Sequence, residues 1–244
     1  IFLASNKTLS TYFEAMLLKS DLILNYDLLL NYPKDIFLKS DFSHDTWVIS
    51  SKVEKKLLDN LKLRNTTLEN HVKNQFNYGI KFGLTEAFLI DAIKRDELIS
   101  HDPNSEKLIA PLIRGRNLTK YGTPNSNDLD FIILAEYGSY KYLEKEYPAI
   151  YNHLIQFEGK LKARGQCNGS SVTLTKPYMG QHHWLELDNN PSKEYLEVFN
   201  KPKIMYQRFQ IKPCFIFDEQ GLYCNDSMWI IPLDDKVLLG ILNS

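Results

Sequence analysis

Four short apolar runs close together near the end of the chain limit its fold more than any other feature. They are residues 204–207, 214–217, 222–224 and 228–231, and each has the length and composition of a strand bounded by turns. Residues 218–221 are typical of a hairpin connection between two of these runs. The segments before them favour helices, and strands do not alternate regularly with helices. The pattern therefore predicts an α+β fold with short helices and a mixed or antiparallel sheet.

Apolar residues at helical spacing predict several helices. Ser51 and Glu54 have the spacing of a capping box, and the helix after them is expected to run to about Leu63. Further helices are expected over 94–100, 105–112 and 147–163, the last with Pro148 in its first turn. Short apolar runs predict strands at 47–49, 87–90 and 132–134. Residues 165–183 are rich in Gly, Ser, Thr and Asn, which predicts a long exposed loop.

The composition is that of a globular protein. Of the 244 residues, 43% are hydrophobic and 24% are charged, which excludes a disordered tail, a collagen-like repeat or a disulfide scaffold. No run of 18 apolar residues predicts a membrane span. Three scattered cysteines without a Cys-x-x-Cys pair fit a reducing cytoplasm, where we expect the protein to be. Because the chain starts at Ile1 and stops just after an apolar run, we expect it to be a piece of a longer protein, cut short at its C-terminus.

Common catalytic motifs are missing from the sequence. It contains no phosphate-binding loop of the Walker type, no dinucleotide fingerprint, no His-Glu-x-x-His zinc helix and no Gly-x-Ser-x-Gly turn. Three pairs of titratable residues lack a neighbouring base or a further ligand that would indicate catalysis or a metal site: His182-His183, Asp128-x-Asp130 and Asp234-Asp235. We therefore assign no catalytic and no metal-binding residue to this chain.

Basic residues are concentrated in three windows. Residues 107–127, 159–185 and 198–217 contain twelve Lys and Arg residues and no Asp or Glu, although the formal net charge of the chain is -1. In the last two windows several aromatic residues are interleaved with the basic ones, which is typical of a nucleic-acid surface. An ordinary solvated face is the alternative explanation for each window.

Two short motifs could bind phosphate. In the first, Gly79-Ile80-Lys81-Phe82-Gly83, two glycines bracket a lysine, so that backbone N–H groups and one cation could face an anion. The alternative is a tight turn before a strand. In the second, Arg114-Gly115-Arg116, two guanidinium groups could bind phosphate or the edge of a guanine. The alternative is the C-terminus of a helix, capped by glycine.

The order of several motifs resembles that of a known family. These motifs are Gly79-Ile80-Lys81-Phe82-Gly83, the run from Ile109 to Arg116, Tyr147-Pro148-Ala149-Ile150-Tyr151, Trp184-x-Glu186-Leu187, the run from Lys201 to Gln207, Asn225-Asp226 and Leu242-Asn243-Ser244. Over residues 47–244 the chain resembles the TaqI-like C-terminal specificity region of adenine-specific DNA methyltransferases and fused type IIG restriction–modification enzymes. The family usually has Thr where this chain has Phe82, so no hydroxyl group is available here to a phosphate.

The resemblance implies a DNA target recognition (specificity) domain over residues 47–244, preceded by a linking region over residues 1–46. The parent enzyme would carry an upstream methyltransferase domain that binds S-adenosylmethionine and flips an adenine, with Mg²⁺ as a further cofactor if it also cleaves DNA. This chain would itself bind no cofactor. Its partners would be double-stranded DNA and the upstream domain, and no membrane.

From the residues themselves, we choose the loop at 165–183, with Tyr178 and Trp184, as the base-reading segment. Core packing is the alternative for Trp184 and Tyr206, and a solvated start of a strand is the alternative for Lys201 and Lys203. The side chains that we expect to contact DNA are Lys81, Arg114, Arg116, Lys120, Lys176, Tyr178, Trp184, Lys201, Lys203, Tyr206 and Arg208.

Two other functions stay open on the sequence alone. The first is a stand-alone nuclease that uses Asp218, Glu219 or Asp226 with a divalent metal ion. The second is an interaction domain whose aromatic residues contact another protein or a glycan. The first predicts metal-dependent cleavage of DNA, and the second predicts no salt-dependent affinity for DNA.

Overall fold

The computed structural model describes residues 11–16, 25–41, 52–122, 124–125, 127, 129–168, 180–189 and 191–244. The chain divides into two compact units, residues 1–71 and residues 72–244. The strand predicted at 47–49 and the cap predicted at Ser51 lie outside the described residues. None of the described helices has both the length and the apolar character needed to cross a membrane. That residues 47–244 form a recognition domain stays a prediction.

The first unit contains a small antiparallel sheet and short helices. In this sheet β1 (Tyr12–Ala15) pairs with β2 (Asp35–Leu38), and the rings of Phe13 and Phe37 stack with their centroids 5.6 Å apart. The other elements are α1 (Tyr26–Asn31), η1 (Lys39–Asp41), α2 (Lys52–Arg64) and α3 (Leu68–His71). Helix α2 confirms the helix predicted to run to about Leu63. Its predicted apolar stripe is largely exposed, at Val53, Leu57 and Leu61.

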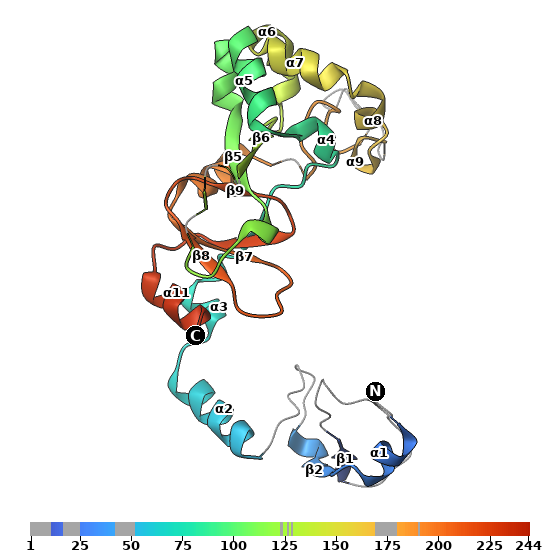
Figure 1. Ribbon diagram of the computed structural model, residues 1–244, viewed down its shortest axis with the longest axis vertical. Coiled ribbons are helices and arrows are strands. Elements are labelled where there is room, and N and C mark those ends of the chain that lie inside the picture. The colour runs from blue at the N-terminus through green and yellow to red at the C-terminus, as the bar shows by residue number, and fades with distance from the viewer. Residues whose placement is uncertain are drawn as a thin grey trace. The chain divides into compact units, whose positions relative to one another are not determined.

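The second unit is built on two four-stranded sheets (Figure 1). The first is antiparallel and has the order β3 (Asn77–Tyr78), β10 (Met228–Ile231), β7 (Lys203–Gln207), β8 (Phe215–Asp218). The second is mixed and has the order β4 (Leu89–Ile90), β6 (Leu129–Ile133), β5 (Ile109–Ile113), β9 (Tyr223–Cys224). Only β9 runs parallel to its neighbour in that sheet. The predicted α+β fold is confirmed.

Short helices connect the strands of the second unit. They are α4 (Thr85–Phe88), α5 (Ala92–His101), η2 (Pro103–Leu108), η3 (Gly115–Asn117), η5 (Ser139–Lys141), α6 (Leu143–Glu146), α7 (Pro148–Ile155), α8 (Glu158–Lys162), α9 (Gly165–Asn168), α10 (Lys193–Glu197), η6 (Val198–Asn200) and α11 (Lys236–Leu242). Helix α5 begins where the Asp91 carboxylate accepts a hydrogen bond from the backbone N–H of Lys94, at 2.8 Å. Figure 1 shows helices α4 to α8 gathered beyond β6, and α11 beside β8.

The structure confirms some predicted elements and corrects others. All four runs between 204 and 231 contain strands, and α5 and β6 lie where they were predicted. The helix predicted over 105–112 is present only as far as Leu108, in the 3-10 helix η2, because the apolar run 109–113 pairs with β6 as strand β5. Residues 218–221 are not a hairpin, since β8 and β9 belong to different sheets. The predicted helix over 147–163 is interrupted between α7 and α8, and the predicted strand at 87–90 is half helix.

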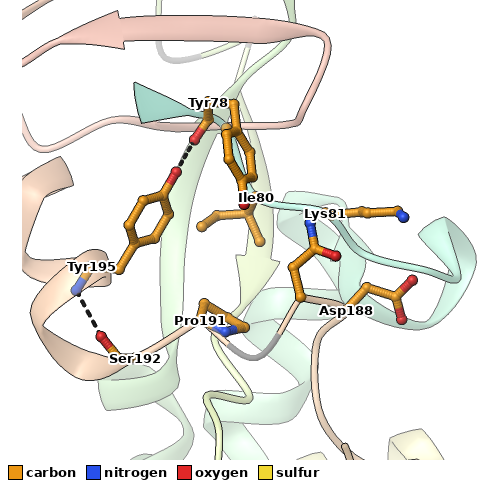
Figure 2. A pocket seen from close by; sticks show the side chains of 9 residues that line it. Tyr78, Ile80, Lys81, Asp188, Pro191, Ser192 and Tyr195 are labelled. Carbon is orange, nitrogen blue, oxygen red and sulfur yellow. Dashed lines mark hydrogen bonds between the residues drawn. The ribbon is translucent and has the colours of Figure 1, made fainter. Parts of the chain in front are cut away.

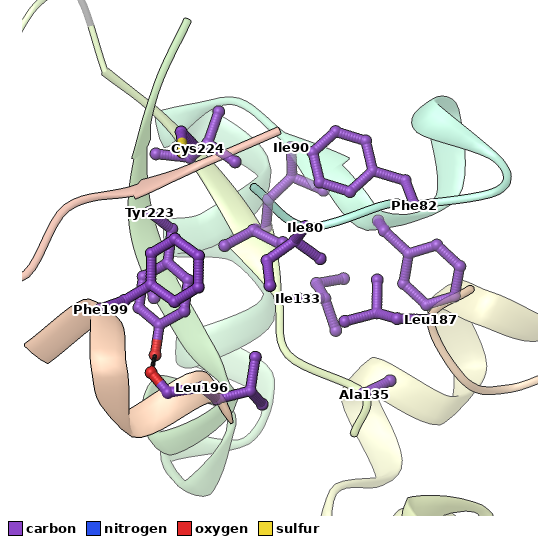
Figure 3. Close-up of a cluster of buried hydrophobic side chains, with 14 of the residues drawn as sticks. Ile80, Phe82, Ile90, Ile133, Ala135, Leu187, Leu196, Phe199, Tyr223 and Cys224 are labelled. Carbon is purple, nitrogen blue, oxygen red and sulfur yellow. Dashed lines mark hydrogen bonds between the residues drawn. The ribbon is translucent and has the colours of Figure 1, made fainter. Parts of the chain in front are cut away.

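One cluster of buried apolar side chains joins the two sheets of the second unit (Figure 3). Within it the ring of Phe199 stacks on that of Tyr223, with the centroids 4.6 Å apart and the planes 12° from parallel. The Tyr223 hydroxyl donates a hydrogen bond to the carbonyl of Leu196 at 3.1 Å. Burying a side chain such as Phe199 contributes about 1.5–3 kcal/mol to stability. Ile80 and Phe82 also belong to the cluster, so the core holds their segment close to β9.

Candidate nucleic-acid interface

Three segments that are far apart in the sequence run parallel and end at one edge of the second unit. β9 pairs in parallel with β5, with Cys224 opposite Ile113, and Ile80 forms a parallel bridge with Asn225. Neighbouring strands lie about 4.8 Å apart, so the backbones at Ile80 and Arg114 are about 10 Å apart with Asn225 between them. The two phosphate-binding candidates of the sequence, Gly-Ile-Lys-Phe-Gly and Arg-Gly-Arg, are thus brought together.

Gly79 permits this arrangement because its backbone touches the neighbouring segment. A Cβ atom at Gly79 would lie 2.0 Å from the carbonyl oxygen of Asn225. The N–H of Gly79 donates to the carbonyl of Met228 at 2.9 Å, and the N–H of Ile80 donates to that of Cys224 at 2.7 Å. The segment therefore joins the strand β10 of one sheet to the strand β9 of the other. Glycine is needed at this position because the two backbones lie too close together to leave room for a Cβ atom.

Gly83, the second glycine of the motif, packs against a carboxylate of the chain itself. It has a φ of +72°, in the left-handed region that favours glycine, and a Cβ atom there would lie 2.2 Å from Oδ1 of Asp188. Burial raises the pKa of Asp188, but its hydrogen bond with His182 and the charges of Arg164 and Lys81 outweigh burial and lower it overall. The tight turn that the sequence allowed is therefore present, and a phosphate contact at the half-buried Lys81 stays a prediction.

A buried arginine holds this turn in place. The guanidinium of Arg164 donates to the Asp188 carboxylate at 3.0 Å and to the carbonyl of Phe82 at 3.1 Å. It also donates to the carbonyls of Trp184 at 2.8 Å and Glu186 at 2.7 Å. The side chain of Arg164 is 5% exposed, so these hydrogen bonds replace nearly all of its contact with water. Residues 82, 184, 186 and 188 are thus fixed around one cation.

His182 belongs to the same network, and its ring is protonated on both nitrogens and positively charged at neutral pH. Its Nε2 donates to Asp188 at 3.1 Å, and its Nδ1 donates to the carbonyl of His183 at 2.8 Å. Burial disfavours the charged ring, but the hydrogen bonds to Asp188, Cys167 and the His183 carbonyl raise the pKa of His182 to about 9. For His183 burial dominates, and with the charges of Lys162 and His182 it lowers the pKa to about 4. Residues 180–189 are therefore a firmly held segment. Of the exposed loop predicted over 165–183, residues 165–168 form helix α9 instead, and residues 169–179 lie outside the described residues.

Further cations lie next to Arg-Gly-Arg. A Cβ atom at Gly115 would lie 2.4 Å from Nε2 of Gln207, so η3 packs directly against the end of β7. The N–H of Tyr121 donates to the carbonyl of Phe215 at 3.4 Å, which places this part of the chain beside the start of β8. We call the cationic side chains on these neighbouring segments the basic edge: Arg114, Arg116, Lys120, Arg208 and Lys212.

Most side chains of the basic edge have no acidic partner among the described residues. Arg114 is half-buried and forms an ion pair with Asp130 through its Nε atom. The other four are exposed, and none of them forms an ion pair with a residue in the described part of the chain. The guanidinium of Arg208 lies 5.3 Å from the ring centroid of Phe209. Like charges repel one another until an anion neutralises them, so the charge of this edge favours a partner with several negative charges.

A cleft of about 240 Å³ adjoins the segment that carries Lys81 (Figure 2). Its lining includes Tyr78, Lys81, Asp188, Ser192 and Tyr195. The Tyr195 hydroxyl donates a hydrogen bond to the carbonyl of Tyr78, and the two rings lie with their centroids 5.9 Å apart. Figure 2 shows the Lys81 side chain extended away from both tyrosines. The cleft thus offers aromatic surface and one cation.

The structure brings some of the predicted contact residues together and separates others. Arg114, Arg116, Lys120 and Arg208 belong to the basic edge, and Lys81 lies on the other outer segment of the three parallel ones, across Asn225 from Arg114. Lys201 precedes β7 whereas Arg208 follows it, so the two lie about 20 Å apart along the strand. Lys176 and Tyr178 lie outside the described residues.

The prediction that Lys203 contacts DNA is wrong, because the side chain is fully buried. Its ammonium group forms an ion pair with Asp218, the residue opposite it on β8, and donates a hydrogen bond to the carbonyl of Phe199. Burial lowers the pKa of Lys203, and the negative charge of Asp218 opposes that shift. Lys203 is therefore a structural residue.

Burial also argues against the nuclease alternative, which assigned a metal ion to Asp218, Glu219 or Asp226. Asp218 is buried, and besides Lys203 it accepts hydrogen bonds from the backbone N–H groups of Gln220 and Leu222, both at 3.0 Å. Glu219 forms an exposed ion pair with Lys236 at 3.1 Å. Among the described residues no group of three or more His, Cys, Asp or Glu side chains could hold a metal ion.

Two of the three predicted aromatic contacts, Trp184 and Tyr206, are half-buried. Trp184 lies in the firmly held segment, where the ammonium group of Lys162 is 5.4 Å from its ring centroid. Tyr206 packs on Phe215 with the ring centroids 5.0 Å apart, and burial raises its pKa. Contacts within the chain therefore cover much of the surface of each side chain, and the contact of Trp184 and Tyr206 with DNA stays a prediction.

Sequence reasoning missed several residues that build this surface. Phe209, Ile211 and Lys212 were not among the expected contacts, although the basic and aromatic window 198–217 contains all three. Gln207 and Asn225 carried no such signal, since each matters through a contact with a segment that is far away in the sequence, Gln207 with Gly115 and Asn225 with Gly79 and Ile80.

Comparisons with known proteins give few matches. No model of a protein family and no curated protein matches this chain. Among solved structures, the chain is similar to the Type IIL restriction–modification enzyme MmeI in complex with DNA, with a TM-score of 0.43 and 12% sequence identity. The match covers 69% of this chain and 20% of that chain, so this chain spans about a fifth of the enzyme. A likeness of this degree carries no functional assignment.

Proposed function

We propose that this chain binds duplex DNA and recognises its sequence, as the specificity part of a restriction–modification enzyme that methylates adenine at N6. The observation that carries the proposal is the basic edge. Four exposed cations without an acidic partner in the described part of the chain lie on segments that pack against one another. A duplex carries one negative charge per about 1.7 Å of its axis, which is the charge pattern that such an edge would neutralise.

The arginines of the basic edge have different surroundings and therefore different roles in this proposal. Asp130 fixes the guanidinium of Arg114, so this residue orients the turn and offers its remaining N–H groups to a backbone phosphate. Arg116 is exposed and has no ion pair with a described residue, so its planar fork is available to a phosphate or to the edge of a guanine. Lys120 and Arg208 position the duplex through phosphates.

Cofactors and the second partner belong to the parent enzyme in this proposal. An upstream methyltransferase domain would bind S-adenosylmethionine, and a nuclease domain, where one is present, would bind Mg²⁺. No residue of this chain is assigned to either. The chain would hold the duplex in register while the upstream domain extrudes the adenine.

Fluorescence anisotropy with a labelled duplex tests the DNA binding. The double variant Arg116→Ala/Lys120→Ala should bind about tenfold more weakly than the wild-type chain at 50 mM salt, because two phosphate contacts are lost. Lys145→Ala is the matched control, since Lys145 is an exposed lysine of α6 and not part of the basic edge. Equal affinities for the double variant and the wild type would contradict the proposal.

Sequence recognition is tested separately. Repeated selection of bound molecules from a pool of randomised duplexes should enrich one short consensus, since base contacts discriminate by about 1–3 kcal/mol per base pair. A pool that stays random after selection, while binding itself persists, would reduce the proposal to binding without sequence preference and would contradict the specificity role.

A further inference from the structure

The loop between β7 and β8 exposes two large apolar side chains at the basic edge. Phe209 is 83% exposed and Ile211 is fully exposed, whereas Gln210 between them is half-buried. Exposed apolar residues scattered singly over a surface are ordinary, but two in three positions of one loop form a local apolar tip. We call Phe209 and Ile211 the apolar tip.

The base of this loop is firmly held, so the apolar tip is presented in a defined way. The Gln210 side chain donates to the carbonyl of Gln207 at 3.0 Å and accepts from the N–H of Cys214 at 2.7 Å, which ties the two ends of the loop together. The N–H of Arg208 donates to the carbonyl of Ser227 at 3.0 Å. Asn243, which is fully buried, is hydrogen-bonded to both the N–H and the carbonyl of Phe215, just after the loop.

The charges around the apolar tip decide what kind of partner fits it. Arg208 and Lys212 flank the tip in sequence, and the contact of Gly115 with Gln207 brings Arg116 close to the start of the loop. An apolar protein surface would remove these cations from water without neutralising them, which is unfavourable. A nucleic-acid duplex offers phosphates to the cations and the flat apolar faces of stacked bases to the tip.

We propose that the apolar tip inserts as a wedge between two neighbouring base pairs of the bound duplex, unstacks that step and bends the helix. Arg208 and Lys212 then contact phosphates on the two sides of the opened step. The inference rests on the proposed DNA binding and adds a mode of recognition to it, because the cost of opening a step depends on its sequence. No covalent bond forms or breaks.

The test compares two duplexes that differ only in stacking. A 20-base-pair duplex is prepared with a matched centre and, separately, with a two-base mismatch there, and 2-aminopurine beside the centre reports unstacking. Because the mismatch has already lost stacking, the full chain should bind it about tenfold more tightly than the matched duplex, which is about 1.4 kcal/mol. On the matched duplex, binding should raise the 2-aminopurine fluorescence.

Two variants complete the experiment. Phe209→Ala/Ile211→Ala should lose both the preference for the mismatch and the fluorescence rise, while its affinity keeps the salt dependence of the wild type. It should fold normally, since both side chains are exposed. Ile93→Ala, which removes an exposed isoleucine of α5, is the matched control and should behave as the wild type.

The outcomes separate this inference from the proposed function. Salt-dependent binding with equal affinity for both duplexes overturns the wedge and leaves the proposed function standing. Absence of binding to either duplex at 50 mM salt overturns both. Self-association of the chain that the double variant abolishes, together with equal affinity for the two duplexes, assigns the apolar tip to a protein contact and also overturns the wedge.

Discussion

At the scale of single residues, Arg164 supports the surface on which the proposed function depends. One guanidinium, 5% exposed, is hydrogen-bonded to the carbonyls of Phe82, Trp184 and Glu186 and to the Asp188 carboxylate. The turn that carries Lys81 and the segment 180–189 therefore share one cation. A lysine could not replace it, because a single ammonium group lacks the planar fork that reaches several acceptors.

Replacing Arg164 by methionine should lower the free energy of unfolding by about 3–5 kcal/mol, because Asp188 would lose one of its two cationic partners and three buried carbonyl groups would lose their donor. Urea unfolding followed by circular dichroism measures this. The control is Lys160→Met, which removes the exposed ion pair between Lys160 and Glu86 and should cost less than about 1 kcal/mol. Similar losses in the two variants would show that the buried network contributes no more than a surface pair.

His182 predicts a dependence of stability on pH. Its pKa is raised to about 9 in the fold, above the value of about 6.5 in an unfolded chain, so its contribution is complete below about pH 6.5 and is lost as the pH rises through 9. The difference in unfolding free energy between the wild type and His182→Gln should therefore shrink by up to about 3 kcal/mol between pH 6.5 and 9.5. Comparing the two proteins cancels the contributions of other titrating groups, such as Cys224, whose pKa is raised to about 12 by burial. Parallel pH profiles for the two proteins would refute this role of His182.

At the scale of elements, the segment 77–80 is what links the two sheets. It pairs with β10 through Asn77 and Tyr78 and continues alongside β9 through Gly79 and Ile80. The core holds the same segment through Ile80. The separation of Lys81 from the basic edge is therefore set by backbone pairing and not by flexible side chains.

Gly79→Ala should destabilise the chain by about 1–3 kcal/mol, because its methyl group would overlap the carbonyl of Asn225 and push the two segments apart. Gly159→Ala is the matched control: no atom lies within 4 Å of that Cβ position in α8, so the substitution should stabilise the helix by about 0.5–1 kcal/mol. Thermal unfolding of the two variants gives the comparison. A Gly79→Ala variant as stable as the wild type would mean that the two segments are not in close contact.

Local sequence patterns predicted elements correctly where the pattern was long or had clear turn residues at its ends, as for α5 and the strand β10. They failed at 109–113, where five apolar residues with Pro111 suit a helix end or a strand equally well. The strand is possible because Pro111 pairs with β6 only, and β9 begins to pair one residue later, at Leu112. Lys203 was misread because its partner, Asp218, comes from the next strand.

At the scale of the whole molecule, the acid-free windows indicated which parts of the sequence are basic but not which would meet. Arg116, Lys120 and Arg208 converge because Gly115 touches Gln207 and Tyr121 touches Phe215, contacts between segments about ninety residues apart. Lys201 comes from the same window as Arg208 and lies at the other end of β7. No local pattern encodes such contacts, so the candidate site could be predicted as residue types and not as a surface.

The salt dependence of DNA affinity tests the central claim, that the basic edge binds the phosphates of a duplex. We predict that log affinity falls linearly with log salt concentration, and that Arg116→Ala, Lys120→Ala and Arg208→Ala each reduce the slope by about 0.9, as expected for one lost phosphate contact. Lys145→Ala should leave the slope unchanged. Slopes that stay equal to the wild-type value in all three variants would contradict the claim.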